Sequence, residues 1–434
     1  MSSKTYGRKL DPFRTFKEPF GVKGSRQTVV IPNNPTTIAA NEQLFIRFPK
    51  LDPHDVIVPG TVRLAFNISL TSEDADRTLV QNRGRALIKK LTIRMNGTEI
   101  MSLDNADLFY CYLDMWNPKH VRDDGLYQGI DTSNNRNITK LRIGAQSARR
   151  VQPDFAISEV LGNRFHIPLD FELLSTTAPF HQSSLSDQLE YQITFNDYSD
   201  VINTSEGASA TYNIQNICLE YEKVTDQRLA EAIRSQYGRD KKVIFYERVL
   251  RYTTQRKCKS DKMWNFGINV PARSMKGILM LFKEPESPFS RNTEVFYNPK
   301  IEKVSVTIEG VPNKLFSQGM LPYQHWDEIK KYFSSSPGIK ILEPIASKVI
   351  KDLCLADVSF GEYLTKKYAL WLDLRTTDDE ELHGSGLSLE KLSQGICLDI
   401  EKKVESEGPI DVYMYIIYDA QINFQDTRLS DVIY

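Results

Sequence analysis

Apolar and polar residues alternate in two short segments that lie half the chain apart. Residues 88–97 read IKKLTIRMNG, and residues 301–310, which lie 213 positions later, read IEKVSVTIEG. The alternating apolar positions are Leu91, Ile93 and Met95 in the first segment and Val304, Val306 and Ile308 in the second. Period-two alternation is typical of a strand buried on one face, and the glycine that ends each segment permits a tight turn. This pair of segments predicts a β-domain that the chain contains twice.

Further alternating segments surround each copy of the motif. In the first half of the chain, strands are predicted at residues 27–31, 43–48, 62–70, 88–95, 98–101, 164–171, 189–195 and 212–222. In the second half, they are predicted at residues 243–255, 264–270, 275–282, 301–309, 367–374, 396–400 and 412–418. Each half therefore holds about eight short strands, and an all-β domain of this kind is typically a jelly-roll sandwich.

The clearest helical pattern separates the two halves. Residues 225–237 (TDQRLAEAIRSQY) begin with a Thr/Asp cap, place Leu229, Ala232, Ile233 and Gln236 on one face, and are followed by Gly238 as a C-terminal stop. The apolar face of such a helix must be buried. We expect this helix to brace the two β-domains.

Each half also has a second helical segment followed by a long connection. Residues 104–116, with Asp104 as the expected cap, and residues 323–333 follow the turn of the repeated motif. Long connections at residues 117–160 and 334–361 come next, in corresponding positions of the two halves. The order of elements therefore agrees between the halves, beyond the ten-residue motif.

These patterns predict an all-β protein made of two tandem eight-stranded jelly rolls with a few short helices. The size of the chain agrees, because 434 residues exceed what one hydrophobic core usually supports. The expected divisions are a basic N-terminal arm (1–26), a first jelly roll (27–224), a connecting helix (225–240), a second jelly roll (241–424) and a polar C-terminal tail (425–434).

The charge balance points away from nucleic acid as the main partner. Lys and Arg number 55 against 56 Asp and Glu, so the whole chain has no strong positive field. Two basic clusters (Arg83, Arg85, Lys89 and Lys90; Arg256, Lys257 and Lys259) lack the interleaved aromatic residues that stack on bases. A net charge near zero favours association of the chain with itself.

Cysteine usage and the N-terminus favour a soluble chain made in a reducing compartment. The five cysteines are scattered, without a spacing typical of a metal site or a disulfide framework. Cys218 and Cys397 lie in strand-like runs, so we expect both to be buried thiols. The N-terminal residues have no apolar stretch, and no apolar run approaches the length of a membrane span.

Motifs for catalysis or cofactor binding are absent from the sequence. The six histidines include no HxH or HExxH, and no phosphate-binding loop, GxGxxG or GxSxG motif occurs. His166 is best explained as a strand residue with a structural partner, and the acidic run 378–381 as a solvated turn, with a cation site as the alternative. We predict no catalytic, cofactor-binding or metal-binding residue, and no enzyme activity.

Three segments resemble a known family. Residues 165–173 (FHIPLDFEL), 179–202 (PFHQSSLSDQLEYQITFNDYSDVI) and 212–229 (YNIQNICLEYEKVTDQRL) resemble double jelly-roll, hexon-like major capsid proteins of viruses. The chain is most similar to those of Polinton/Maverick elements and adintoviruses. It is more distantly similar to capsid proteins of virophages, large DNA viruses and tectiviruses.

This resemblance implies a function in assembly. It implies a homotrimeric capsomer with a pseudo-hexagonal outline, which tiles an icosahedral DNA-virus shell beside neighbouring capsomers, penton and minor capsid proteins. It also implies that residues 117–160 and 334–361 interlock the trimer at its outer surface, and that the arm 1–26 lies at the inner face. The protein would be made in the host cytoplasm and reside in the virion, without binding a specific nucleic-acid sequence.

Two alternatives remain open on the sequence. A two-domain jelly-roll enzyme, such as a cupin or a glycan hydrolase, would need a metal or a pair of carboxylates in a cleft. A scaffold protein of the same fold, present during capsid assembly and then discarded, would share every pattern described above.

Overall fold

The structure is a computed structural model. It describes residues 24–116, 164–169, 181–238, 242–333, 358–376, 386–389 and 395–434, apart from gaps at 59, 73–77, 81, 204–209, 287–290 and 313–318. The predicted connection at 117–160, most of the one at 334–361, the acidic run 378–381 and nearly all of the arm 1–26 lie outside these residues.

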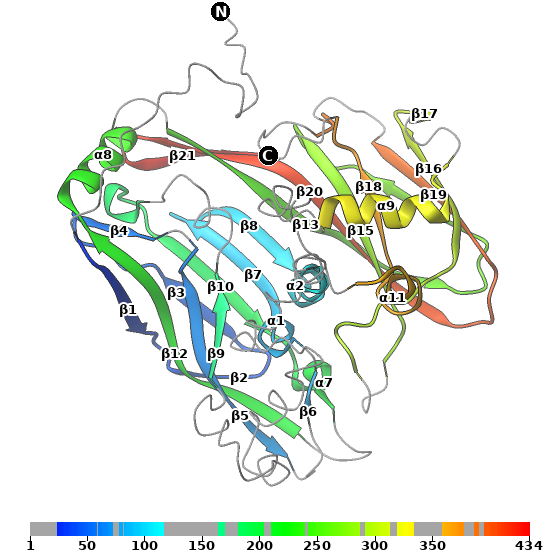
Figure 1. The fold of residues 1–434 in the computed structure, drawn as a ribbon, viewed down its shortest axis with the longest axis horizontal. Helices are drawn as coiled ribbons and strands as arrows, with labels where there is room; N and C mark the ends of the chain where they lie inside the picture. Colours follow the sequence, from blue (N-terminus) through cyan, green and yellow to red (C-terminus); the bar gives the residue numbers. More distant parts are fainter. Residues whose placement is uncertain are drawn as a thin grey trace, which may run out of the picture.

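The first domain contains two antiparallel sheets (Figure 1). One has the order β1 (Arg26–Pro32), β12 (Ala210–Thr225), β5 (Arg63–Ser72) and β9 (Arg164–Pro168), with β2 (Thr37–Ala39) and β4 (Asp55–Ile57) also paired to β12. The other has the order β3 (Gln43–Arg47), β10 (Leu189–Phe195), β7 (Ile88–Met95) and β8 (Thr98–Asp104). A short ribbon joins β6 (Thr78–Leu79) to β11 (Ile202–Asn203).

The second domain repeats this arrangement. One sheet has the order β13 (Lys242–Cys258), β20 (Pro409–Gln425), β15 (Met275–Lys283) and β18 (Ala369–Asp373), with β21 (Arg428–Ile433) also paired to β20. The other has the order β14 (Met263–Ile268), β19 (Ile396–Lys402), β16 (Ile301–Ile308) and β17 (Val311–Pro312). Within the described residues, no sheet combines strands from the two halves of the chain.

The strand order identifies both domains as jelly rolls. If the eight principal strands of each domain are numbered along the chain, one sheet has the order 1-8-3-6 and the other 2-7-4-5, and this holds in both domains. This is the eight-stranded double-sheet arrangement in which connections cross between sheets. The predicted fold class, two tandem jelly rolls, is confirmed. The inner faces of the sheets carry the alternating apolar residues; β10, for example, alternates buried and partly exposed positions along its whole length.

The repeated sequence motif occupies the same place in both domains. β7 and β16 are the fourth strands of their domains, and each turns into the fifth strand through two residues with positive φ. These are Asn96 and Gly97 in the first domain and Glu309 and Gly310 in the second. Met95 pairs with Thr98, and Ile308 pairs with Val311, so the constant offset of 213 positions continues through both hairpins.

The helices lie at the connections between strands. The short ones are α1 (Arg83–Ala86), α7 (Tyr198–Val201), α11 (Phe360–Thr365) and the 3₁₀ helix η3 (Gln182–Ser184). The longer ones are α2 (Ala106–Met115), α8 (Gln227–Gly238) and α9 (Pro322–Phe333), which correspond to the three predicted helical segments. In each domain a long helix follows the fifth strand, α2 after β8 and α9 after β17.

Two local predictions at the ends of elements are wrong. Asp104 does not cap α2, because it is the last residue of β8; the cap position belongs to Asn105, which adopts a left-handed conformation and makes no side-chain cap hydrogen bond. The residues 425–434 are not simply a polar tail. Most of them form β21, which returns antiparallel to β20 after a turn at Asp426 and Thr427.

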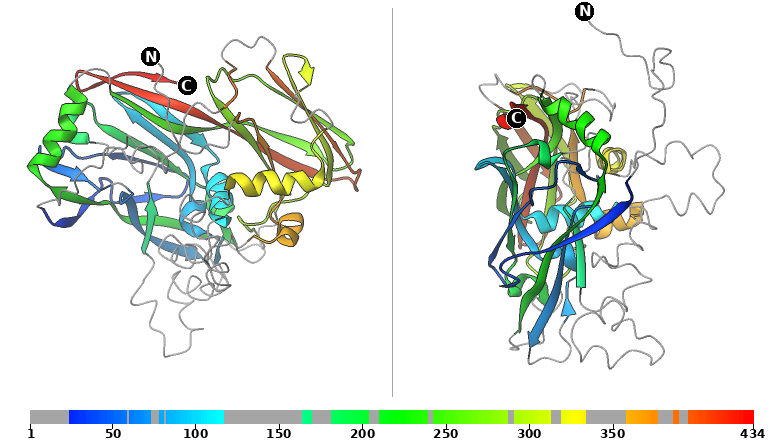
Figure 2. Two further views of the ribbon diagram at one scale, coloured as in Figure 1. Left: turned by 45° about the horizontal axis from the view of Figure 1, so that its top comes forward. Right: turned by 90° about the vertical axis from the view of Figure 1, so that its left-hand side faces the viewer.

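Two long strands and a shorter one beside them connect the domains in space. β13 and β20, each 17 residues long, extend beyond the second sandwich, and β21 lies beside the far end of β20. Figure 2 shows β20 and β21, in red, running along the first domain as far as α8. The second domain therefore reaches over the first through its own sheet.

Candidate functional site: the junction between the two domains

One contact between the domains is a set of aromatic rings that we call the aromatic junction. Helix α2 contributes Phe109, Tyr112 and Trp116, all buried. Ring centroids are 5.2 Å apart for Phe109 and Tyr415, 5.1 Å for Tyr112 and Phe296, 5.7 Å for Trp116 and Trp326, and 6.4 Å for Trp116 and Phe333. Tilted and edge-on ring pairs of this kind add stability beyond the apolar area that they bury.

The spacing of residues in α2 explains the aromatic junction. Phe109, Tyr112 and Trp116 are three and four positions apart, so they share one face of the helix. Residues such as Leu108 and Met115 are buried as well. A helix that is apolar around most of its circumference must be covered on more than one side. The first domain covers one side of α2, and the second domain covers the side with the aromatic rings.

A second contact lies at the tip of the hairpin between β7 and β8. Arg248 of β13 is buried and donates a hydrogen bond of 2.9 Å to the carboxylate of Glu99. Its guanidinium lies 4.0 Å from the ring centroid of Tyr434, whose hydroxyl donates to the carbonyl of Glu99. The hydroxyl of Tyr246 donates to the carbonyl of Ile100. The second domain thus binds this hairpin by both charge and backbone hydrogen bonds.

A third contact holds the N-terminal end of α2. Arg251 of β13 donates to the carboxylate of Asp104 at 3.3 Å, and the hydroxyl of Tyr415 donates to the carbonyl of Asn105 at 2.9 Å. The last residue of β8 and the start of α2 are therefore held by β13 and β20, the two long strands that extend from the second sandwich.

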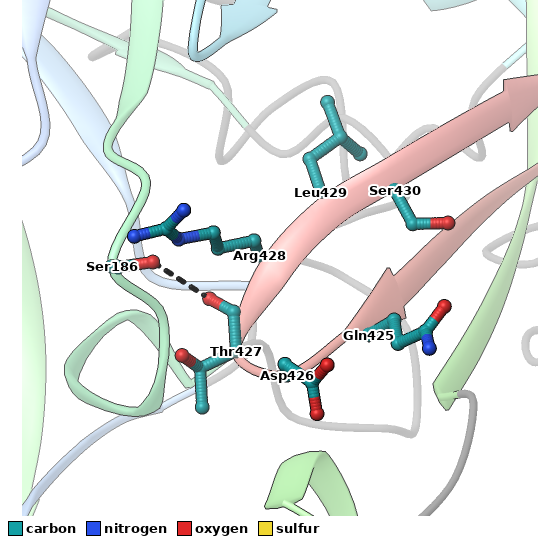
Figure 3. A pocket seen from close by; sticks show the side chains of 7 residues that line it. All are labelled: Ser186, Gln425, Asp426, Thr427, Arg428, Leu429 and Ser430. Atoms are coloured by element: carbon teal, nitrogen blue, oxygen red, sulfur yellow. Dashed lines mark hydrogen bonds between the residues drawn. The ribbon is translucent and has the colours of Figure 1, made fainter.

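The turn between β20 and β21 makes a fourth contact at the far end of the first domain. The backbone NH and the hydroxyl of Ser186 both donate to the carbonyl of Thr427, at 3.0 and 3.2 Å. Figure 3 shows the bond from the hydroxyl. The NH of Leu429 donates to the carboxylate of Asp187 at 2.9 Å. A surface recess of about 550 Å³ lies here, lined by Ser186 and residues 425–430. Among its lining residues in the described part of the chain, the charged ones are Asp426 and Arg428.

Helix α8 packs beside this turn. Asp226 accepts a hydrogen bond of 2.9 Å from the NH of Leu229, which is the expected capping interaction. Ala230, Ile233 and Tyr237 are buried, and the Tyr237 ring lies 5.8 Å from Phe424 of β20. The helix therefore contacts the extended sheet of the second domain. The buried face differs in part from the predicted one, because Ala232 is exposed, whereas Ile233 is buried together with Ala230 and Tyr237.

An acidic side chain lies close to the aromatic junction. Burial raises the pKa of the Asp107 carboxyl to about 7, and the nearby Asp200 raises it further, while the NH of Leu108, the amide of Asn196 and the ammonium of Lys283 oppose this shift. One carboxylate oxygen accepts a bond of 3.1 Å from Asn196, and the other is buried. The charged form of Asp107 is therefore poorly solvated at this site.

This arrangement predicts a pH-dependent stability. The pKa of Asp107 is higher in the folded chain than in the unfolded chain, so its contribution is fully present below about pH 4 and is lost as the pH rises to about 7. The substitution Asp107→Asn keeps an acceptor for Asn196 and removes the charge. At pH 8 it should raise the free energy of unfolding by on the order of 1–3 kcal/mol, with a smaller gain at pH 5. Thermal unfolding of both proteins at the two pH values measures this, and equal gains at pH 5 and 8 would contradict it.

Three histidines within the described residues are held by protein partners. His166 makes a 2.9 Å hydrogen bond with Glu220, as expected for a strand residue with a partner. His181 bonds to Ser184 and to the carbonyl of Asp55, and His325 bonds to Tyr368 and to the carbonyl of Met320. His54 has no close acidic or cysteine cluster around it, and the described ranges contain no group of three or more His, Cys, Asp or Glu that could hold a metal ion.

The cysteines and basic clusters also have clear environments. Cys218 is buried as expected, but the prediction for Cys397 is wrong, because its side chain points outward from β19 and is exposed. Lys90 pairs with Asp104, Arg256 with Asp411, Lys259 with Glu284 and Arg85 with Asp114. These partners neutralise much of the charge that the sequence clusters suggest. No helix in the described part of the chain is long and apolar enough to span a membrane.

With the geometry in place, the fold can be assigned: it is the double jelly roll, two sandwiches held together in one chain. No protein-family model and no curated protein sequence matches the chain.

Solved structures do match. A chain of the PBCV-1 virus capsid aligns with a TM-score of 0.61 and 9% identity, covering 96% of this chain and 99% of that one. The Faustovirus major capsid protein aligns with a TM-score of 0.57 and 9% identity, covering 95% and 92%. The mavirus major capsid protein aligns with a TM-score of 0.50 and 11% identity, covering 100% and 96%.

These matches extend over nearly the whole of both chains, so they include both sandwiches and their order. The identities are low enough that the likeness concerns the fold. The resemblance noted in the sequence, to double jelly-roll major capsid proteins, is confirmed at the level of that fold.

Proposed function

We propose that this chain is the major capsid protein of a DNA virus and that it acts as a structural rather than a catalytic protein. The observation that carries the proposal is the junction between two jelly rolls of the same strand order in one chain. Three copies of such a chain contain six similar domains, which supports a homotrimeric capsomer with a pseudo-hexagonal outline. Units of that outline pack side by side over a flat facet.

The physical properties of the junction suit this role. A capsomer must keep a constant angle between its two domains, and the junction combines buried aromatic rings, the buried Arg248 and two long strands that reach across. The same extended whole-chain likeness to a virus capsid chain and to two major capsid proteins supports the assignment.

The proposal includes location and partners. The protein would reside in the virion after synthesis in the host cytoplasm, and would contact neighbouring capsomers, penton proteins and minor capsid proteins. The basic arm 1–26 would face the inside of the shell. The similarity to Polinton/Maverick and adintovirus capsid proteins remains a prediction from the sequence.

The mass of the purified protein tests the proposal. We expect light scattering to give three times the chain mass of 49.8 kDa, and electron micrographs to show particles with a hexagonal outline. A stable monomer at micromolar concentration would refute the homotrimer. Finding the protein in assembly intermediates but not in finished particles would favour the scaffold alternative. Metal content or sugar binding would favour the jelly-roll enzyme.

A further inference from the structure

A buried histidine lies in one of the helices that join the two domains. His325 is the fourth residue of α9 and is only 1% exposed. The same helix carries Trp326 and Phe333, whose rings pack against Trp116 of the first domain. Figure 2 shows α9, in yellow, with one end against α2, in cyan. A change at His325 can therefore reach the aromatic junction through α9.

Two hydrogen bonds select the neutral form of the His325 ring. A carbonyl oxygen only accepts, so Nε2 carries the ring proton and donates to the carbonyl of Met320 at 3.3 Å. Nδ1 then carries no proton, and it accepts from the hydroxyl of Tyr368 at 2.7 Å. Met320 and Tyr368 are themselves buried. The site is therefore matched to an uncharged imidazole with one donor and one acceptor.

The surroundings of this pair are aromatic. The Tyr368 ring lies 5.9 Å from the ring of Phe282 and 5.1 Å from that of Tyr363. In the described part of the chain, the His325 ring bonds to Met320 and Tyr368 and to no carboxylate. Burial lowers the pKa of His325 to about 4, and the Met320 carbonyl opposes this shift in part.

Charged side chains on the neighbouring elements are exposed or paired with one another. The pairs are Glu328 with Lys331, Lys283 with Glu286, and Glu362 with Lys367, and the exposed ones are Glu302, Lys303, Asp327 and Lys330. The other titratable groups nearby are the phenols of Tyr112, Tyr363 and Tyr368, and burial raises the pKa of all three, so they stay neutral. A proton added to His325 therefore meets no counter-charge among the described residues.

Protonation of His325 also disrupts its hydrogen bonds. The added proton occupies Nδ1, so the hydroxyl of Tyr368 can no longer donate to that atom. This hydroxyl bonds to no other group in the described residues, and the new charge is buried among aromatic rings. A buried charge without a partner is costly, and the cost falls if α9 shifts and lets water reach the ring. Trp326, the next residue in the helix, would then move relative to Trp116.

The direction of the pH effect follows from the folded and unfolded states. The pKa of the His325 ring falls from its ordinary value of 6.5 to about 4 on folding, so its contribution to stability is complete above about pH 6.5 and is lost as the pH falls towards 4. Between pH 7.5 and pH 5, this lowers the folding equilibrium constant by about 30-fold. His181 acts in the same direction and Asp107 in the opposite one, so the effect of His325 is measured by comparing variants at each pH.

We propose that His325 and Tyr368 form an acid-sensitive switch in the second domain: on acidification the imidazole takes up a proton from water, and α9 then loosens from the aromatic junction. The switch regulates the contact between the two domains and operates within a single chain. Its biological use, a shell that opens more easily in an acidic compartment, rests on the proposed function.

The substitution His325→Gln tests the switch. The glutamine amide can donate to the Met320 carbonyl but takes up no proton in this pH range. We expect a change from pH 7.5 to pH 5 to lower the folding equilibrium constant of the unchanged protein about 30-fold more than that of the variant. His54→Gln is the matched control, because His54 is exposed, and it should respond to acid as the unchanged protein does. Denaturant unfolding at both pH values measures all three proteins, and equal responses of the unchanged protein and His325→Gln would refute the switch.

Hydrogen exchange tests the switch in the unchanged protein. After correction for the intrinsic exchange rate, peptides covering α9 should lose protection between pH 7.5 and pH 5, and by more than peptides covering β10 of the first domain. If α9 is as well protected at pH 5 as at pH 7.5, the switch is refuted, and this result stands even if His325→Gln does not fold.

The acid response and the proposed function fail in different ways. Both measurements record the response of the chain in whatever oligomer it forms. A monomeric protein would refute the homotrimer and leave the acid response standing. A trimer whose α9 does not respond to acid would refute the switch alone.

Discussion

Replacing Trp116 with alanine is expected to lower the free energy of unfolding by about 3–5 kcal/mol, the usual cost of deleting a large buried aromatic side chain. Trp116 is almost fully buried and its ring contacts Trp326 and Phe333 of the second domain. The cavity would lie between the domains, where neither sandwich can collapse to fill it. Denaturant unfolding measures the loss, and light scattering should show a lower yield of trimers, because the angle between the domains is less well held.

Phe45→Ala is the matched control for this prediction. Phe45 is also a large aromatic residue, but it lies half exposed on the edge strand β3. Its loss should change the free energy of unfolding by less than about 1 kcal/mol. If both variants lose the same amount of stability, the aromatic junction is not the structural bond between the domains that we infer.

Ile233→Asp is the second substitution with a large expected effect. Ile233 is buried in α8, on the face that also carries Ala230 and Tyr237. A carboxylate there would be buried without a partner, and we expect a loss of a few kcal/mol, about 2–5, in the free energy of unfolding. Because α8 contacts β4 of the first domain and β20 of the second, the substitution should also reduce the yield of trimers.

Ala232→Asp provides the comparison within the same helix. Ala232 is the neighbouring residue and is exposed, so the new carboxylate remains in water. We expect a loss of only about 0.5 kcal/mol, from helix propensity. Thermal unfolding of the two variants side by side measures the difference, and an Ile233→Asp protein as stable as Ala232→Asp would show that α8 does not brace the domains.

The strands were largely predictable because their signal is local. In a strand such as β10, apolar and polar residues alternate over seven consecutive positions, LEYQITF, and this pattern shows which face is buried. Its predicted bounds, 189–195, agree with the structure. The hairpin after β7 was predictable for the same reason, since Asn96 and Gly97 tolerate the positive φ values that a tight turn requires.

The elements that were missed lack such a signal. β17 has only two residues, and β21 has the mixed sequence RLSDVI, which becomes a strand because β20 offers it an unpaired edge. Asp104 was wrongly expected to cap α2 because β8 extends three residues beyond the predicted strand at 98–101, as far as the pairing of Asp104 with Lys90. Cys397 lies in an alternating run, but on its outer face.

The junction could not be predicted residue by residue. A single sequence shows that Phe109, Tyr112 and Trp116 share a helix face, but not which rings cover them. The hydroxyl of Tyr415 reaches the carbonyl of Asn105, which lies 310 positions earlier in the chain. Contacts between residues so far apart in the chain depend on how the two folded domains are placed relative to each other. No local sequence pattern encodes that placement. The one available signal was that α2 is too apolar for a helix covered on one side only.

The sequence by itself determined that the chain contains two β-domains of the same plan, because strand periodicity and the offset of 213 positions are properties of neighbouring residues. Only the tertiary structure decided how the domains meet, through the aromatic junction and through the length of β13 and β20 that extends over the first domain. The physical reason is that burial within a sandwich follows the period of its strands, whereas burial between sandwiches depends on residues far apart in the chain.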